Sequence, residues 1–160
     1  MAKARSNRNE DGKPVETGES HQRFRSTSTA DPGAARALAI DAARMLSDDK
    51  CEDVVVLDVS TLSQLSDYIV IGSGTSDRQM ASSADDVEEM AQKPPHNSPL
   101  YRRSKDDRAT WVVLDFVDVV VHVFEPNTRA HYDLEMMWED APHVAWERPG
   151  KDKRDRAGVT

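Results

Sequence analysis

Cysteine and long apolar runs are scarce in this 160-residue chain, and each scarcity excludes a class of protein. Cys51 is the only cysteine, so neither an intramolecular disulfide nor a metal site of several thiolates can form within one chain. No apolar run approaches the roughly 20 residues of a membrane-spanning helix. The basic N-terminus is followed by no apolar stretch of the kind found in signal peptides. We therefore expect a soluble, cytoplasmic protein.

Large apolar residues are also scarce at both ends of the chain. Residues 1–33 hold six Lys/Arg and five Asp/Glu, and residues 147–160 hold five and three. Such segments bury too little surface to offset the entropy of ordering, so both are predicted to be disordered tails around one folded domain, residues 34–146. The tails carry +1 and +2 of the total charge of −8, which leaves −11 on the domain. This acidity disfavours a direct grip on nucleic acid and suits docking on a basic protein.

Capping residues and apolar periodicity predict two long helices. Asp31 can cap a helix that continues to about Asp48. Ser76 and Gln79 fit a capping box, in which Ser76 accepts from the helix backbone and Gln79 reaches back to the cap. The second helix is expected to end before Pro94.

Short β-branched runs predict the strands, over residues 54–59, 68–71, 111–116 and 119–124. A polar stretch, 94–109, is expected to be a long loop, and a short helix is expected from about Asn127. Strands that alternate with helices early and pair as a hairpin late predict an α/β domain, a compact mixed β-sheet flanked by helices.

A glycine-containing loop, residues 72–77, lies between a predicted strand and a predicted helix. Free backbone N–H groups and the helix dipole can bind phosphate at such a place. However, no Gly-Lys-Ser/Thr follows, the third glycine of a dinucleotide site is missing, and no Asp-x-Asp supplies metal ligands after Gly72 and Ser73. A tight turn with a helix cap is the favoured interpretation. A nucleotide-binding or nucleotidyltransferase enzyme that uses this loop is the alternative.

Candidate catalytic and metal-binding residues are few. Asp115, Asp118 and His122 could hold a metal or move protons, but His131 and His143 lack ligand spacing with them. We expect His122 to form a hydrogen bond within the sheet instead. No nucleophile has a recognisable base partner, so the sequence predicts no catalytic residue, no metal site and no cofactor.

Aromatic and sulphur-containing residues gather near the end of the domain: Trp111, Tyr132, Leu134, Met136, Met137 and Trp138. They can form core between the last helix and the sheet, and this is the expectation for Leu134. Trp, Tyr and Met are also favoured at the centres of protein interfaces. Trp111 shares a strand face with Asp115, and an unpaired buried carboxylate is costly. We therefore expect that truncating Trp111 or Tyr132 weakens partner binding more than folding.

The order of these motifs resembles the Iojap family, the ribosomal silencing factors, over roughly residues 34–146. The resemblance rests on Asp67-Tyr68, residues 74–79, Trp111-x-x-x-Asp115, residues 118–124, Arg129, Tyr132-x-Leu-Glu135 and Trp138. It implies a nucleotidyltransferase-like fold without enzymatic activity. It also implies a factor that binds the large ribosomal subunit through ribosomal protein fourteen of that subunit, blocks joining of the small subunit and represses translation.

The resemblance implies a set of partner-binding residues, namely Trp111, Asp115, Asp118, Tyr132 and Leu134. Two departures concern the edges of this set. The family usually has glycine where this chain has Val117, so we expect a different turn there, because valine resists positive φ. A basic stretch, residues 102–108, replaces an acidic Glu-Gly element. The sequence leaves open whether the chain also forms a homodimer.

Overall fold

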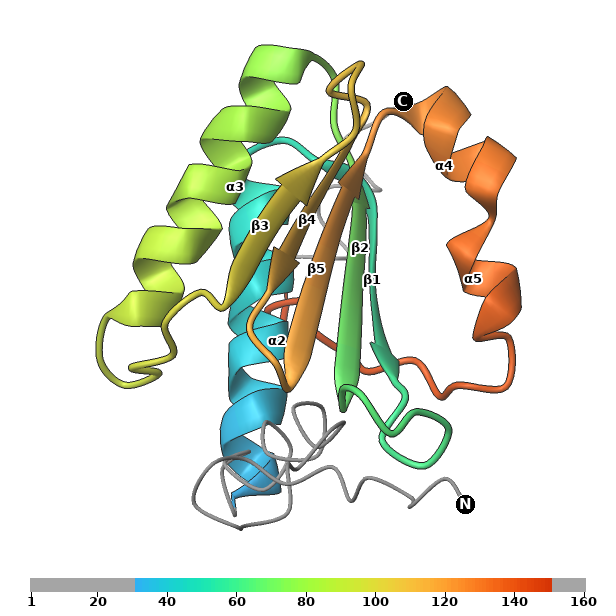
Figure 1. Cartoon of the computed structure of the whole chain (residues 1–160). Coiled ribbons are helices and arrows are strands. Elements are labelled where there is room, and N and C mark those ends of the chain that lie inside the picture. Colours follow the sequence, from blue (N-terminus) through green and yellow to red (C-terminus); the bar gives the residue numbers. More distant parts are fainter. Residues whose placement is uncertain (1–30, 151–160) are drawn as a thin grey trace, which may run out of the picture.

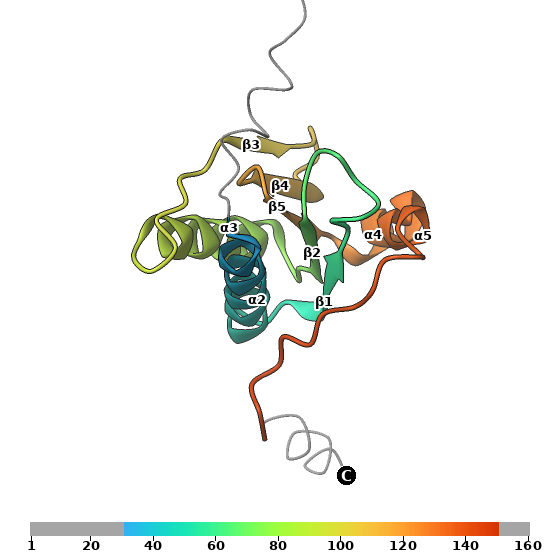
Figure 2. The same cartoon turned by 90° about the horizontal axis from the view of Figure 1, so that it is seen from below.

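The computed structural model of the protein describes residues 31–150. The predicted tails, 1–33 and 147–160, lie mostly outside this range, and their disorder stays a prediction. Within it, helices lie on both faces of one sheet (Figure 1), and the view along the strands separates the layers (Figure 2). This is the α/β architecture that the sequence predicts. None of the helices between residues 31 and 150 is long and apolar enough to cross a membrane.

The sheet has five strands in the order β1-β2-β5-β4-β3. Their bounds are β1 (Glu52–Asp58), β2 (Tyr68–Ser73), β3 (Arg102–Lys105), β4 (Trp111–Asp115) and β5 (Val119–Phe124). All neighbours run antiparallel except β2 and β5, which pair in parallel from Tyr68 with Val119 to Ser73 with Phe124. The sheet is therefore mixed, as expected.

Two long helices, α2 (Pro32–Asp48) and α3 (Asp77–Gln92), cover one face of the sheet. Ser76 caps α3, because its Oγ accepts from Gln79 N at 3.1 Å. The Gln79 side chain reaches back one residue further than a capping box predicts: its Oε1 accepts from Thr75 N at 2.9 Å. Both predicted helices are thus confirmed, with one capping contact displaced.

The main core lies between these two helices and the sheet. Leu46 from α2, Met80 from α3 and Leu114 from β4 are among its fully buried side chains. A second, smaller cluster lies on the opposite face and includes Ile71 and Phe124. Leu134 and Trp138, from the segment that follows β5, pack against this second cluster.

The expectation of a structureless loop over 94–109 is wrong in part, because β3 lies within it. The four residues of β3 are all exposed and have no apolar alternation, so their sequence carries no strand signal. Backbone pairing with β4, from Arg102 with Asp115 to Lys105 with Val112, makes them a strand. Arg103 also donates to Asp85 of α3 at 2.6 Å, which ties the strand to the helix layer. Tertiary contacts outweigh local propensity here.

The turn between β4 and β5 places a non-glycine residue at a positive φ. Val117 has φ +74°, and Asp118 N donates to Phe116 O across it at 3.0 Å. Asp115 Oδ1 accepts from Val117 N at 2.8 Å, which supports the turn from within. Val117 thus adopts the positive φ that valine is expected to resist, and a turn different from that of the family stays a prediction. Valine is held in a left-handed conformation that its branched side chain disfavours.

Val117→Gly is expected to raise the free energy of unfolding by about 1 kcal/mol, because relief of the left-handed conformation exceeds the added entropy of the unfolded chain. Urea unfolding followed by circular dichroism measures the change. Val113→Gly is the matched control: Val113 is also half-buried but lies within β4, so the same replacement should destabilise the protein. Equal destabilisation by both would contradict strain at Val117.

Candidate functional site

The candidate site lies on the sheet face opposite α2 and α3, which we call the open face. Along β4, Val112 and Leu114 are buried under the long helices, whereas Trp111, Val113 and Asp115 are half-buried on the open face. This is the alternation that the sequence predicts. Two short helices, α4 (Pro126–Tyr132) and α5 (Leu134–Met137), lie over part of the open face (Figure 2).

Local contacts direct the chain from β5 into α4. Glu125 caps the helix, and its carboxylate accepts from Asn127 N at 3.2 Å and from Thr128 N at 3.1 Å. Pro126 follows at the first helical position, which its fixed φ suits. Asp133, in a left-handed conformation with φ +46°, ends α4 and precedes α5. The two short helices are therefore separate elements joined at a bend.

Arg129 holds this bend against the sheet. Its guanidinium forms two hydrogen bonds with Glu135 of α5, Nε to Oε2 at 3.2 Å and Nη2 to Oε1 at 2.6 Å. Its Nη1 also donates to Ser73 Oγ, at the buried end of β2, at 2.9 Å. Two parallel hydrogen bonds between a guanidinium and a carboxylate fix the relative orientation of the two side chains as well as the distance between them. Arg129 and Glu135 therefore position α4 and α5 on the open face.

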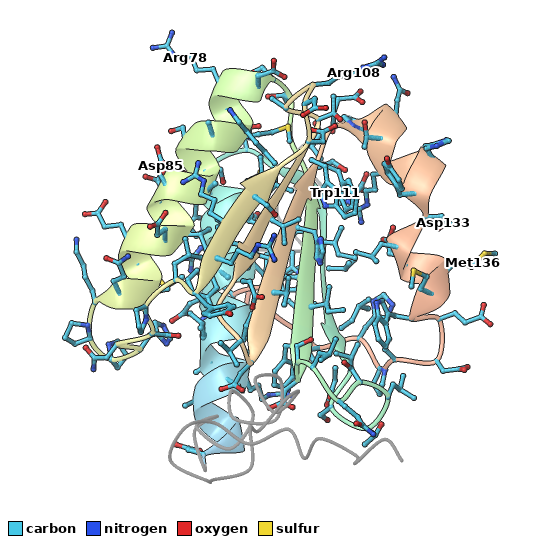
Figure 3. All side chains as sticks on the ribbon, viewed as in Figure 1. Arg78, Asp85, Arg108, Trp111, Asp133 and Met136 are labelled. Carbon is cyan, nitrogen blue, oxygen red and sulfur yellow. The ribbon has the colours of Figure 1, made fainter. Side chains whose placement is uncertain are left out.

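Trp111 is the centre of an aromatic cluster on the open face (Figure 3). Its ring centroid lies 4.9 Å from that of Phe124 and 4.9 Å from that of Tyr132. Its Nε1–H donates to Nδ1 of His122 at 3.1 Å, which leaves the His122 proton on Nε2. Burial lowers the pKa of His122 to about 4, so the ring is neutral at pH 7 and can accept this bond. The expected hydrogen bond of His122 within the sheet is thus confirmed.

A groove of about 440 Å³ runs over the open face beside this cluster. We call it the docking groove. It is formed by the loop before β2, by strands β2, β4 and β5, by the start of β3 with the residue before it, and by α5 with the residue after it. Its lining residues are Ser63, Gln64, Leu65, Ser66, Ile69, Tyr101, Arg102, Asp115, Val117, Val120, His122, Leu134, Met137 and Trp138.

Large apolar side chains stand exposed around the docking groove. Leu65 is 82% exposed, Met137 72% and Tyr101 55%. Among them, Asp115 and the Nε2 side of the neutral His122 ring supply polar groups. A mostly apolar hollow with a few polar groups is typical of a binding site, and exposed apolar patches mark interaction surfaces.

A larger hollow of about 560 Å³ lies between the β3–β4 connection and α4, but it is a weaker candidate. Two of the carboxylates that line it already accept hydrogen bonds from backbone N–H groups. Asp106 accepts from Thr110 N and Trp111 N, and Glu125 caps α4. Its lining also has a smaller apolar share than that of the docking groove.

The structure places the five predicted partner-binding residues unequally. Asp115 and Leu134 line the docking groove. Trp111 is half-buried beside it, and Tyr132 is 54% exposed at the edge of the aromatic cluster. Asp118 lies in the β4–β5 turn, where its carbonyl accepts from Asp67 N and Tyr68 N, and it does not line the groove. The assignment of all five to partner binding stays a prediction.

Leu65 and Tyr101 line the docking groove but are absent from the predicted site. Leu65 lies in the loop between β1 and β2, and Tyr101 directly precedes β3. Neither belongs to a periodic pattern. The one signal that could have identified Leu65 is a large apolar residue among loop serines, since such a residue has no core to join.

In the glycine loop, residues 72–77, two backbone N–H groups already donate to acceptors within the protein. Gly74 N donates to Phe124 O at 2.7 Å, and Thr75 N is taken by Gln79. A Cβ added to Gly74 would lie 2.1 Å from Cγ of Met80, so the glycine serves close packing. These contacts favour the turn-and-cap interpretation over a phosphate-binding loop.

The described residues contain no grouping of three His, Cys, Asp or Glu side chains arranged to hold a metal ion. The single cysteine, Cys51, is buried, and burial raises the pKa of its thiol. Its sulphur lies 3.7 Å from Ser83 Oγ in the core. At neutral pH this side chain is therefore a thiol packed in the interior.

Comparison with known proteins agrees with the resemblance in the motifs. Residues 32–159 match the family described as "Ribosomal silencing factor during starvation". The chain is 37% identical over 110 residues to a protein from Halalkalibacterium halodurans named "Ribosomal silencing factor RsfS", covering 69% of this chain and 90% of that one. It is 32% identical over 95 residues to a mouse protein named "Mitochondrial assembly of ribosomal large subunit protein 1", covering 59% of this chain and 42% of that one.

Solved structures agree as well. A crystal structure of a protein from Chromobacterium violaceum has a TM-score of 0.60 and 29% identity to this chain, covering 76% of this chain and 97% of that one. The family match, the sequence identities and the shared fold lead to one conclusion: this chain belongs to the ribosomal silencing factor family.

Proposed function

We propose that this protein binds the large ribosomal subunit through ribosomal protein fourteen of that subunit, prevents the small subunit from joining, and thereby represses translation. Binding alone accounts for such an effect, so no catalytic step and no cofactor form part of the proposal. The docking groove on the open face is the surface that we assign to this contact. The single observation that carries the assignment is the exposure of Leu65 and Met137 around an apolar hollow.

The apolar content of the docking groove supports a protein partner. Side chains such as Leu65 and Met137 are more than two-thirds exposed, although each is large and apolar. Covering them removes apolar surface from water, which is the main favourable term in protein association. Methionine also adapts to the shape of a partner, because its side chain is unbranched and polarizable. The groove is thus suited to receive an apolar anchor from another protein.

Charge supports a basic partner. Residues 34–146 carry a net charge of −11, whereas the docking groove itself is lined by one carboxylate, Asp115, and one guanidinium, Arg102, so the negative field comes from the domain as a whole. Ribosomal proteins are in general basic, so the long-range field of this domain would speed encounter with them. Charge complementarity of this kind sets association rate and orientation more than affinity.

The names of relatives support a partner on the ribosome. One carries the large ribosomal subunit in its name, and others are named ribosomal silencing factors. Ribosomal protein fourteen and the block of subunit joining follow from the family resemblance of the motifs. They are proposals for this chain.

Sedimentation through a sucrose gradient tests the proposal. Purified protein is mixed with separated ribosomal subunits under conditions in which the subunits join. We expect the protein to travel with the large subunit and to lower the yield of joined ribosomes. If saturating protein leaves subunit joining unchanged, the proposal is contradicted.

Met137→Asp tests where the partner binds, because it places a charge within the apolar docking groove. We expect at least a tenfold loss of affinity for the large subunit, the effect of losing a central interface anchor. Met136→Asp is the matched control. Met136 is the neighbouring residue, 66% exposed, and it points away from the sheet and does not line the groove (Figure 3). Equal loss with both variants would exclude the groove as the binding surface.

A further inference from the structure

A second groove lies on the other side of the molecule, between the two long helices α2 and α3. We call it the helix groove. Its volume is about 450 Å³, and its lining residues are Asp41, Met45, Asp86, Glu89, Met90, Lys93, Pro94, Pro95 and His96. Three lining residues are acidic. Glu89 pairs with Lys93 at 2.8 Å, and Asp41 lies 2.7 Å from Nε2 of the lining residue His96 and 3.9 Å from Nη1 of Arg44. The helix groove therefore combines an apolar floor with an excess of formal negative charge, and the function proposed above does not use it.

Asp86, which lines the helix groove, lies close to a second carboxyl group outside the lining. Asp49, at the C-terminal cap of α2, faces Asp86 of α3. Oδ2 of Asp49 is shielded from solvent and has no hydrogen-bond partner among the described residues. Burial and the neighbouring Asp86 raise the pKa of Asp49 to about 6. A cation beside this pair would relieve both the repulsion and the missing partner.

The C-terminus of α2 also lacks positive charge of its own. No basic residue lies in its last turn, where the helix dipole favours cations. Lys50 follows the cap residue, and a further cation comes from the far end of the chain: Arg148 pairs with Asp48 through Nη1 at 2.9 Å and Nη2 at 3.0 Å. The C-terminal segment thus already supplies one charge to this acidic helix end.

The path of the chain leads toward the helix groove. Val144 N donates to Val56 O, and Trp146 Nε1 donates to Val54 O, so the segment follows β1 back toward the start of that strand. Arg44 of α2 donates to Trp146 O at 2.7 Å. The described chain ends at residue 150, just past the Arg148–Asp48 contact.

The next residues are basic. Residues 151–156 have the sequence Lys-Asp-Lys-Arg-Asp-Arg, four cations and two acidic groups. Six extended residues span about 20 Å, whereas α2 rises only about 10 Å from Asp41 to Asp48. The segment is therefore long enough to follow the whole helix groove.

We propose that residues 151–156 of this chain dock in the helix groove, with their Lys and Arg side chains paired to the carboxylates of α2 and α3. The low apolar content of this segment leaves charge as the force that holds it. Exposed ion pairs are individually weak and are screened by salt, so the docking is favoured at low ionic strength. This inference is independent of the ribosome proposal, because the helix groove and the docking groove lie on opposite sides of the sheet.

Carbodiimide cross-linking of the full-length chain at low salt tests the proposal, since it joins lysine amines to carboxylates in direct contact. We expect Lys151 or Lys153 to link to Asp49, Asp86 or Glu89. Asp133 and Glu139, exposed carboxylates near the open face, should not link to these lysines. Equal linking to both sets of carboxylates, or no linking of these lysines, would overturn the proposal.

A mixture of isotopically light and heavy protein distinguishes docking within one chain from pairing of two copies. Links in which both peptides carry the same label are expected. Mixed-label links at a statistical frequency would overturn the proposal and assign the helix groove to a second copy.

Charge reversal supplies a second test, which does not depend on a cross-linking reaction. Lys153→Glu combined with Arg154→Glu is expected to lower the melting temperature by about 3 °C at low salt, and by much less in 0.5 M salt. Arg5→Glu combined with Arg8→Glu makes the same charge change in the N-terminal tail and should leave the melting temperature unchanged. An equal decrease with both pairs, or none with the first, would contradict docking.

Discussion

Gly74→Ala is expected to lower the free energy of unfolding by about 3 kcal/mol, the upper end of what overpacking a core usually costs. The added Cβ would lie 2.1 Å from Cγ of Met80 and 2.8 Å from Oε1 of Gln79. Met80 is fully buried, so its side chain has no free space in which to move away. Gln79 would lose its place in the helix cap. Urea unfolding measures the change.

A double mutant separates the steric cost from any other effect of alanine. Met80→Ala removes the clashing atoms and leaves a cavity that the new methyl group can partly fill. We expect Gly74→Ala to cost less than 1 kcal/mol in that background, which is a coupling of about 2 kcal/mol between neighbours. If the cost is the same with and without Met80, close packing is not the reason for glycine at this position.

Trp111→Ala is expected to lower the free energy of unfolding by about 3 kcal/mol, near the lower limit for a large aromatic residue because Trp111 is only half-buried. Its ring packs on Phe124 and Tyr132, and its N–H serves the buried His122. The sequence alone favoured a role of Trp111 mainly in partner binding. Because of these contacts, we now expect Trp111 to contribute to stability as well. Circular dichroism measures the stability, and binding is compared per folded molecule.

Two further variants separate the contributions of the aromatic cluster to stability and to binding. Trp111→Phe keeps the stacking but leaves Nδ1 of His122 without its donor, so a loss of about 1 kcal/mol is expected. Tyr132→Ala removes a ring that is 54% exposed, so its main effect should be on binding to the large subunit. If Trp111→Ala unfolds no more easily than wild type yet binds weakly, Trp111 belongs to the binding surface alone.

Much of the fold could be predicted because its signals are local. Asp31 and Ser76 mark the helix starts through a side-chain oxygen that accepts from the next turn. The β-branched runs form the strands because both faces of the sheet are at least partly covered. Positions of single elements follow from such short-range chemistry without knowledge of the rest of the chain.

The parts that could not be predicted depend on contacts between distant segments. The strand β3 exists because β4 offers it backbone partners, not because of its own residues. The docking groove is assembled from Leu65, Tyr101, Asp115 and Met137, which four separate segments supply. The left-handed φ of Val117 is imposed by the hairpin against the preference of valine. No local pattern encodes any of these three features.

The single parallel strand pair also affects when the protein can act. Antiparallel neighbours such as β4 and β5 are joined by a short turn and can pair early in folding. In contrast, β2 pairs with β5 only after α3, β3 and β4, which lie between them in the chain, have been made. The docking groove extends over the paired strands β2 and β5, with Ile69 from β2 and Val120 and His122 from β5 in its lining. During synthesis the groove is therefore incomplete until β5, and after it α5, have left the ribosome. A nascent copy would therefore lack the surface that we propose for binding the large subunit while it is still being made.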